Sequence, residues 1–166
     1  MDLSLENKVI LISGSSRGIG KGIAKTLAEE GANVVLTGRA KNELIKTSEE
    51  LERIFPNQVL SHRGDLQDKK VLKELEHKVI SRWGKINGIV ANAANLKKIP
   101  ELNIKEEDWL WFLENNFHVA VRFVNTFTNH LITSKGSIVI ISSIAGLEDL
   151  SAPMPYSVSK AAVNVY

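Results

Sequence analysis

The chain has 166 residues, of which 43% are hydrophobic and 24% charged, a balance typical of one folded domain rather than a disordered segment. Its net charge is +2 without a basic block, so we do not expect nucleic acid as a partner. The lack of cysteine excludes disulfides and thiol catalysis, and the four histidines show no metal-ligand spacing. No apolar run could span a bilayer, and the polar N-terminus does not resemble a signal peptide, so we predict a cytoplasmic protein with no membrane partner.

Strand and helix patterns alternate along the whole chain. Apolar runs predict strands over residues 8–13, 33–38, 58–65, 86–93 and 137–142. Helical patterns lie between them at 18–31, 42–55, 68–83 and 106–133, and a last helix begins near Tyr156. This alternation implies parallel strands with right-handed crossovers. We therefore predict one α/β, doubly wound, Rossmann-like domain over residues 1–166, with ligands at the carboxyl ends of its strands.

A glycine-rich loop follows the first predicted strand. Gly14, Gly18 and Gly20 in "SGSSRGIG" allow a tight turn, a close approach of a pyrophosphate to the backbone, and close packing of helix on strand. A Walker phosphate loop fits less well, because Ser15 stands at the position of its first glycine and Gly22 at that of its Ser or Thr. We therefore assign the loop, with Ser16, Arg17 and Ile19, to a dinucleotide; a glycine-rich turn without a ligand is the alternative.

The end of the second predicted strand bears on which dinucleotide is bound. NAD-binding domains usually place an acidic residue there to hold the ribose hydroxyls. This chain has Gly38 at that point, followed by Arg39, and Arg17 lies in the glycine loop. Two guanidinium groups without a carboxylate favour the 2′-phosphate of NADP(H), with NAD(H) as the second choice. The alternative is that both arginines are merely solvated side chains.

From residue 8 to the last residue, the chain resembles the short-chain dehydrogenase/reductase family, single-domain type. The glycine loop is followed in family order by "GDL", "ANAA", "ENNFHV", "SSIAG" and "YSVSK". Of the adjacent Asn115 and Asn116, we match Asn116 to the family asparagine, because an apolar residue follows it. Ala91 and Ala94 depart from the family's N-N-A-G pattern. The ordered set of motifs at strand ends is specific, whereas Y-x-x-x-K alone would not be.

The resemblance implies roles for individual residues. Tyr156 would donate a proton to a carbonyl oxygen as hydride arrives, with Lys160, one helical turn away, tuning Tyr156 and holding the nicotinamide ribose. Ser143 would hydrogen-bond the substrate oxygen, and Asn116 would hold a water in the proton relay. Further cofactor contacts would come from the strand ends, at Asp65, Leu66, Asn92 and Ala93.

We therefore expect an NADP(H)-dependent oxidoreductase acting on a small-molecule ketone or alcohol, possible substrates including a 3-oxoacyl thioester. Family members continue beyond the position of Tyr166 through further strands and a substrate-covering segment, so we expect the sequence to cover only part of the family domain. A non-catalytic nucleotide-binding domain that retains the fold is the alternative. The aromatic-rich helix at 106–133 predicts core packing; because family members pair through this helix and the tyrosine helix, we also expect a homodimer or homotetramer.

Overall fold

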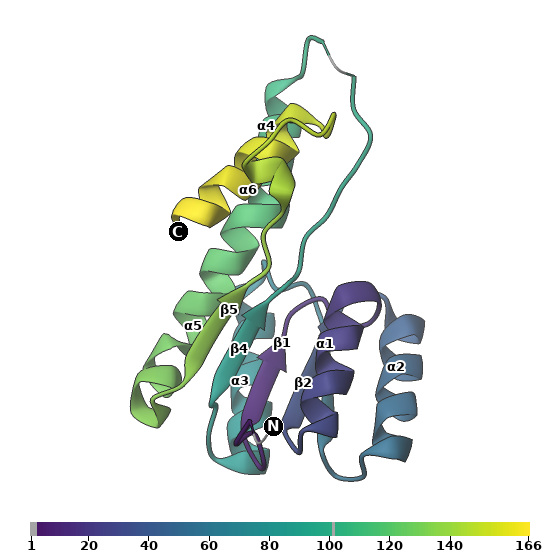
Figure 1. The fold of residues 1–166 in the computed structure, drawn as a ribbon, viewed down its shortest axis with the longest axis vertical. Helices are drawn as coiled ribbons and strands as arrows, with labels where there is room; N and C mark the ends of the chain where they lie inside the picture. Colours follow the sequence, from purple (N-terminus) through teal and green to yellow (C-terminus); the bar gives the residue numbers. More distant parts are fainter. Residues whose placement is uncertain (1–2, 101) are drawn as a thin grey trace.

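The computed structural model describes residues 3–100 and 102–166, which form a five-stranded parallel sheet with strand order β3-β2-β1-β4-β5. All arrows in Figure 1 point the same way, and α4 and α6 lie beyond their tips. The predicted doubly wound α/β fold is therefore confirmed. The strands are β1 (Val9–Ile12), β2 (Asn33–Gly38), β3 (Val59–Arg63), β4 (Gly88–Ala91) and β5 (Ser137–Ile140). The helices are α1 (Gly18–Glu29), α2 (Lys41–Ile54), α3 (Lys69–Trp83), α4 (Glu106–Leu113), α5 (Val119–Ser134) and α6 (Met154–Val165).

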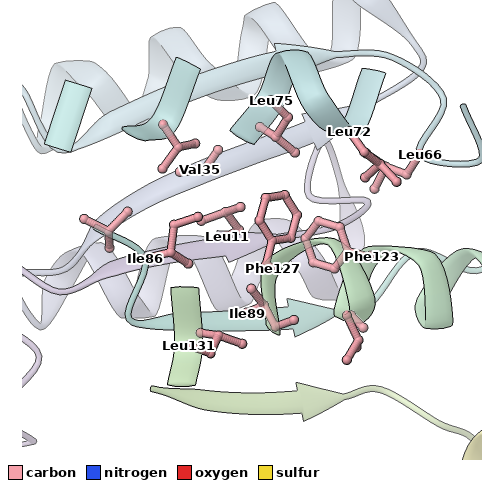
Figure 2. Packing of buried hydrophobic residues seen from close by; sticks show 14 of the residues in the cluster. Leu11, Val35, Leu66, Leu72, Leu75, Ile86, Ile89, Phe123, Phe127 and Leu131 are labelled. Atoms are coloured by element: carbon pink, nitrogen blue, oxygen red, sulfur yellow. The ribbon is translucent and has the colours of Figure 1, made fainter. Parts of the chain in front are cut away.

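The sheet is covered on both faces by helices, because successive strand residues point to opposite sides. On one face, Ile10 and Ile12 of β1 pack with the buried faces of α1 and α2. On the other face, Val9 and Leu11 belong to a larger cluster with α3 and α5. Figure 2 shows Phe123 and Phe127 of α5 lying between Leu11, Ile89 and the α3 leucines. The continuous apolar strands are thus a consequence of burial on two sides.

The helix predicted over residues 106–133 is interrupted. A π-helical turn, η1 (Glu114–His118), separates α4 from α5, and the second helix ends at Ser134. The side chains of Asn115 and Asn116 donate to the carbonyl oxygens of Trp111 and Phe112, each at 2.9 Å. Because a π turn disturbs the regular i→i−4 ladder, these amides supply donors where the helix changes its winding.

Two further expectations are corrected by the structure. The last helix begins at Met154, two residues before Tyr156, with Pro155 in its first turn, where a missing N–H costs nothing. The strand predicted over 137–142 is shorter, because β5 ends at Ile140, and its Ile138 and Val139 are 44% and 50% exposed. Among the described residues, β5 pairs with β4 alone and is an edge of the sheet. Within the same residues, no helix combines the length and the apolar character needed to cross a membrane.

Candidate functional site

The glycine loop joins the carboxyl end of β1 to the start of α1 in a conformation that requires glycine at two positions. Gly14 and Gly18 have φ of +64° and +54°, the left-handed region that residues with a Cβ adopt at a cost. At Gly20 the requirement is space, because an added Cβ would lie 2.5 Å from the carbonyl oxygen of Gly14. A Cβ on Gly18 would meet no atom within 4 Å, so the loop is open on its outer side. The loop is thus shaped for the close approach of another group.

Hydrogen bonds from three neighbouring elements hold this loop. Ser15 Oγ donates to Ile12 O at 2.7 Å and accepts from the Thr37 backbone N–H on β2 at 2.9 Å. Thr47 of α2 is buried, although the apolar pattern did not include it, and its Oγ1 donates to Ser16 O at 2.7 Å. Asn92, directly after β4, donates through Nδ2 to Ser13 O and Gly14 O at 2.9 and 3.1 Å. The loop is therefore fixed before any ligand arrives.

A cleft of about 440 Å³ runs along the carboxyl ends of the strands, from the glycine loop to α6. Every residue that the sequence analysis assigned to the cofactor lines it: Gly14, Ser16, Arg17, Gly18, Ile19, Gly20, Arg39, Asp65, Leu66, Asn92, Ala93, Tyr156 and Lys160. This placement follows from the parallel topology, which brings the ends of β1 to β5 to one edge. The structure thus brings these residues together, while their ligand remains a prediction.

Carboxylates accompany the two arginines at one end of the cleft. Arg17 Nη1 lies 3.4 Å from Glu43 Oε1 of α2, and both side chains are exposed. Arg39 Nη1 lies 3.6 Å from Asp65 Oδ2, beyond β3, and its Nη2 donates to Asn95 Oδ1 at 2.7 Å. Both guanidinium groups therefore have an acidic neighbour, which the sequence analysis did not foresee.

Tyr156 and Lys160 lie at the other end of the cleft, on one face of α6. The Lys160 Nζ is 6.0 Å from the centroid of the Tyr156 ring and donates to Ile141 O at 2.9 Å, just beyond β5. The Tyr156 ring packs edge-to-face on Phe112 of α4, with centroids 6.3 Å apart. Lys160 is only 3% exposed, and this burial lowers the pKa of its ammonium below the ordinary value.

Two of the predicted catalytic residues are not among the residues that line the cleft. Ser143 does not line the cleft; its Oγ accepts from Ala145 N at 3.2 Å and starts a short 3₁₀ turn, η2 (Ile144–Gly146). Asn116 is 1% exposed, and besides its bond to Phe112 O it accepts from Asn95 N at 2.8 Å through Oδ1. The structure therefore places Asn116 as a link between η1 and the loop after β4.

The sequence analysis missed six polar residues that line the cleft: Thr37, Glu43, Gln67, Asn95, Asn115 and Ser142. Asn95 and Gln67 follow β4 and β3 closely, so the rule that ligands meet the carboxyl ends of strands could have included them. Glu43 and Asn115 carry no such signal, because their position depends on helix packing. Among the described residues, no cluster of three or more histidines or acidic residues could hold a metal ion.

Comparison with known proteins extends these observations. A family model described as short chain dehydrogenase matches residues 8–166. An uncharacterised oxidoreductase of Listeria monocytogenes is 34% identical over 168 residues, which cover 98% of this chain and 65% of the relative. The 3-oxoacyl-[acyl-carrier-protein] reductase FabG of Thermotoga maritima is 32% identical over 162 residues, with 97% and 65% covered. The chain therefore spans about two thirds of the length of these relatives.

A solved structure agrees with the same assignment. The L-sorbose reductase of Gluconobacter frateurii, crystallised with NADPH and L-sorbose, matches this chain with a TM-score of 0.92 and 29% identity. The match covers 99% of this chain and 63% of the reductase. The fold described above is thus shared with this reductase over nearly the whole length of the chain.

Proposed function

The chain belongs to the short-chain dehydrogenase family, and on this premise we propose that the protein is an NADP(H)-dependent oxidoreductase that transfers hydride between nicotinamide and a ketone or alcohol. One observation carries the proposal: a single cleft holds the glycine loop and two arginines at one end and the Tyr156–Lys160 pair at the other. A dinucleotide is long enough to need both ends of such a cleft. The similarity to FabG of Thermotoga maritima favours a 3-oxoacyl thioester among the candidate substrates.

The residues present fit a dinucleotide in shape and in charge. The space beside Gly18 is open, and no Arg17 side-chain bond caps the first N–H groups of α1, so a pyrophosphate is expected there. Gly38 ends β2 where a ribose-binding carboxylate would otherwise stand, and Arg39 follows it. The missing carboxylate at Gly38 and the guanidinium of Arg39 support NADP(H) over NAD(H), because a guanidinium binds a phosphate through paired charge-assisted hydrogen bonds.

At the other end of the cleft, side chains of this protein would transfer one proton to the substrate. The cofactor supplies hydride to the carbonyl carbon when bound. Tyr156 would give its phenolic proton to the carbonyl oxygen, and the buried Lys160 ammonium lies 6.0 Å from the centroid of its ring. Ser143 would hold the substrate oxygen, which requires its hydroxyl to reorient from Ala145 N toward the cleft. Asn116 would hold a relay water while remaining bonded to Asn95 N.

Titration of the protein with NADPH and with NADH, followed by nicotinamide fluorescence, tests the cofactor. One charge-assisted contact between a guanidinium and the 2′-phosphate predicts that NADPH binds about ten- to hundredfold more tightly than NADH. Equal affinities in the wild type would refute the NADP(H) assignment. Failure to bind either cofactor would refute the dinucleotide assignment itself.

Reduction of a ketone panel that includes a 3-oxoacyl thioester tests the chemistry. We expect Tyr156→Phe to abolish turnover and to leave NADPH binding nearly unchanged, since the ring still packs on Phe112. Turnover in Tyr156→Phe close to the wild-type value would overturn the role of Tyr156. The second candidate is a non-catalytic nucleotide-binding domain, favoured by the position of Ser143 outside the cleft lining. Cofactor binding without turnover on any ketone would support it.

Homo-oligomer formation is part of the same proposal. Apolar side chains are exposed on α4, α5 and α6, where Leu110 is 56%, Ile132 71% and Met154 60% exposed. A contact with another chain through these helices would cover such side chains. Light scattering should therefore give a mass at least twice the monomer mass, and a monomer at high concentration would refute it.

A further inference from the structure

The Arg39 side chain bridges two loops that stand on opposite sides of the cleft. Its Nη2 donates to Asn95 Oδ1 at 2.7 Å, in the loop after β4, and its Nη1 lies 3.6 Å from Asp65 Oδ2, in the loop after β3. β2, which ends one residue before Arg39, is separated from β4 by β1 in the sheet. To reach Asn95, the guanidinium must therefore extend over the carboxyl end of β1.

Asn95 is an acceptor whose orientation is already fixed. Its Nδ2 donates to Asn115 Oδ1 at 3.3 Å, and its backbone N–H donates to Asn116 Oδ1 at 2.8 Å. Asn115 is held in turn by its bond to Trp111 O and by Gln67 Nε2, which donates to Asn115 Oδ1 at 3.1 Å. With its NH₂ group engaged by Asn115, the Asn95 amide turns its oxygen toward Arg39.

The backbone of Arg39 is also held in place. Arg63 Nε donates to the carbonyl oxygen of Arg39 at 3.1 Å, and β2 pairs with β3 up to Gly38 and Arg63. The side chain therefore starts from a fixed point and ends on a fixed acceptor. Because its backbone and its guanidinium are both hydrogen-bonded, the Arg39 side chain has a defined conformation, although it is about half exposed.

This bridge crosses the part of the cleft in which the adenosine of a dinucleotide would lie. The ribose that carries the 2′ group is expected at the end of β2, and the adenine is attached to that ribose. Asp65 and Asn95 stand on the two sides of this position and both line the cleft. We propose that Arg39 is a latch that Asn95 and Asp65 hold closed over the adenosine half of the cleft, and that must open before a nicotinamide dinucleotide binds.

The latch proposal depends on the proposed nicotinamide cofactor, and it has a consequence for the dissociation constant of that cofactor. When only the open form binds, the apparent dissociation constant is the intrinsic value divided by the open fraction. Both cofactors therefore bind more weakly than they would to an unlatched protein, by the same factor. A 2′-phosphate then offers the released guanidinium a new anionic partner, which a 2′-hydroxyl does not. The latch thus weakens binding of NAD(H) without compensation.

Asn95→Ala removes the Oδ1 acceptor of the Arg39 guanidinium. Its effect on cofactor binding distinguishes a latch from a purely structural role of this hydrogen bond. The expected result is that NADPH and NADH both bind more tightly, by the same factor of about three to ten, because one half-exposed hydrogen bond is lost in the free protein. The ratio of the two affinities stays at its wild-type value. The adenosine-half probe 5′-AMP should gain by the same factor, since the effect lies at that end of the cleft. Leu96→Ala, at an exposed neighbour outside the cleft lining, is the matched control and should change neither affinity.

Arg39→Ala gives a second, independent readout with opposite signs. NADPH should bind more weakly, by up to about tenfold, because it loses the phosphate contact and regains only part of that loss when the latch is removed. NADH should bind about three- to tenfold more tightly, because the latch is gone. Weaker or unchanged binding of NADH by both variants, with unfolding midpoints near that of the wild type, would overturn the latch. If an Asn95→Ala protein does not fold, the NADH result for Arg39→Ala still decides. Failure of the wild type to bind either dinucleotide refutes the proposed function instead, so the two failures are distinguishable.

Discussion

Gly20→Ala perturbs the point at which α1, the glycine loop and the loop after β4 come closest. An added Cβ would lie 2.5 Å from Gly14 O, 2.6 Å from Asn92 Nδ2 and 2.9 Å from Ser15 Cα. Two of these three atoms are backbone and cannot rotate away. The third belongs to the Asn92 amide, whose displacement would break its bonds to Ser13 O and Gly14 O. The substitution must therefore either move α1 or open the loop.

The magnitude follows from three contributions. Overpacking of a closely packed site costs about 1–3 kcal/mol. A lost Asn92 hydrogen bond costs about 1 kcal/mol more, and the better helix propensity of alanine returns about 1 kcal/mol. We expect a net loss of about 1–3 kcal/mol in the free energy of unfolding, together with weaker NADPH binding, because the loop that would receive the pyrophosphate is displaced.

The control for this prediction lies two residues away in the same helix. A Cβ on Gly22 would meet no atom within 4 Å, so Gly22→Ala should stabilise the protein by about 0.5–1 kcal/mol through helix propensity alone. Urea unfolding followed by tryptophan fluorescence measures both variants, and an NADPH titration measures the loop. If Gly20→Ala proved as stable as Gly22→Ala and bound NADPH equally well, the space argument for Gly20 would be wrong.

Three further outcomes are expected. Asp68→Ala should lower the unfolding free energy by about 1 kcal/mol, because Asp68 caps α3 by accepting from Lys70 N at 2.8 Å. Asp68→Asn should stay near the wild-type value, and an equal loss of unfolding free energy in both variants would contradict the role of Asp68 as a cap. Thr47→Val should weaken NADPH binding severalfold by releasing Ser16 O, and unchanged binding would show that the loop does not need this bond. Burial lowers the pKa of Lys160, so the unfolded chain binds the ammonium proton more tightly than the folded protein does. The wild type should therefore gain stability relative to Lys160→Met as the pH rises toward 10.5. Urea midpoints of the two proteins that run in parallel across this range would contradict the prediction.

Much of the fold follows from patterns that depend on few neighbours. The strand–helix alternation, the glycine loop and the left-handed Gly84 that ends α3 each have a local physical cause. The order of these elements also places the cofactor-assigned residues at one edge of the sheet, because parallel strands end together. Position at the strand ends, together with the family resemblance, was therefore sufficient to predict much of the wall of the cleft.

Features that depend on contacts between distant segments were not predictable in the same way. The π-helical turn at Glu114–His118 lies inside an uninterrupted helical pattern, and its two asparagine amides donate to helix carbonyl oxygens. The exposure of β5 depends on which segments cover the sheet, not on its apolar sequence. The orientation of Ser143 depends on the 3₁₀ turn that its hydroxyl caps. In each case the sequence specifies the residue, and the packing decides what its side chain does.

The arginine pairs show how such contacts change a functional prediction. The sequence argument for NADP(H) treated Arg17 and Arg39 as guanidinium groups without a carboxylate near the end of β2. In the structure, Glu43 and Asp65 reach the same region from α2 and from the loop after β3. A 2′-phosphate must therefore compete with these carboxylates for the guanidinium donors, and its net gain is the difference between two charge-assisted contacts. The preference for NADPH should accordingly lie nearer tenfold than hundredfold, and it should rise in Glu43→Gln, which leaves Arg17 without its anionic neighbour. A preference unchanged in Glu43→Gln would show that Arg17 takes no part in cofactor choice.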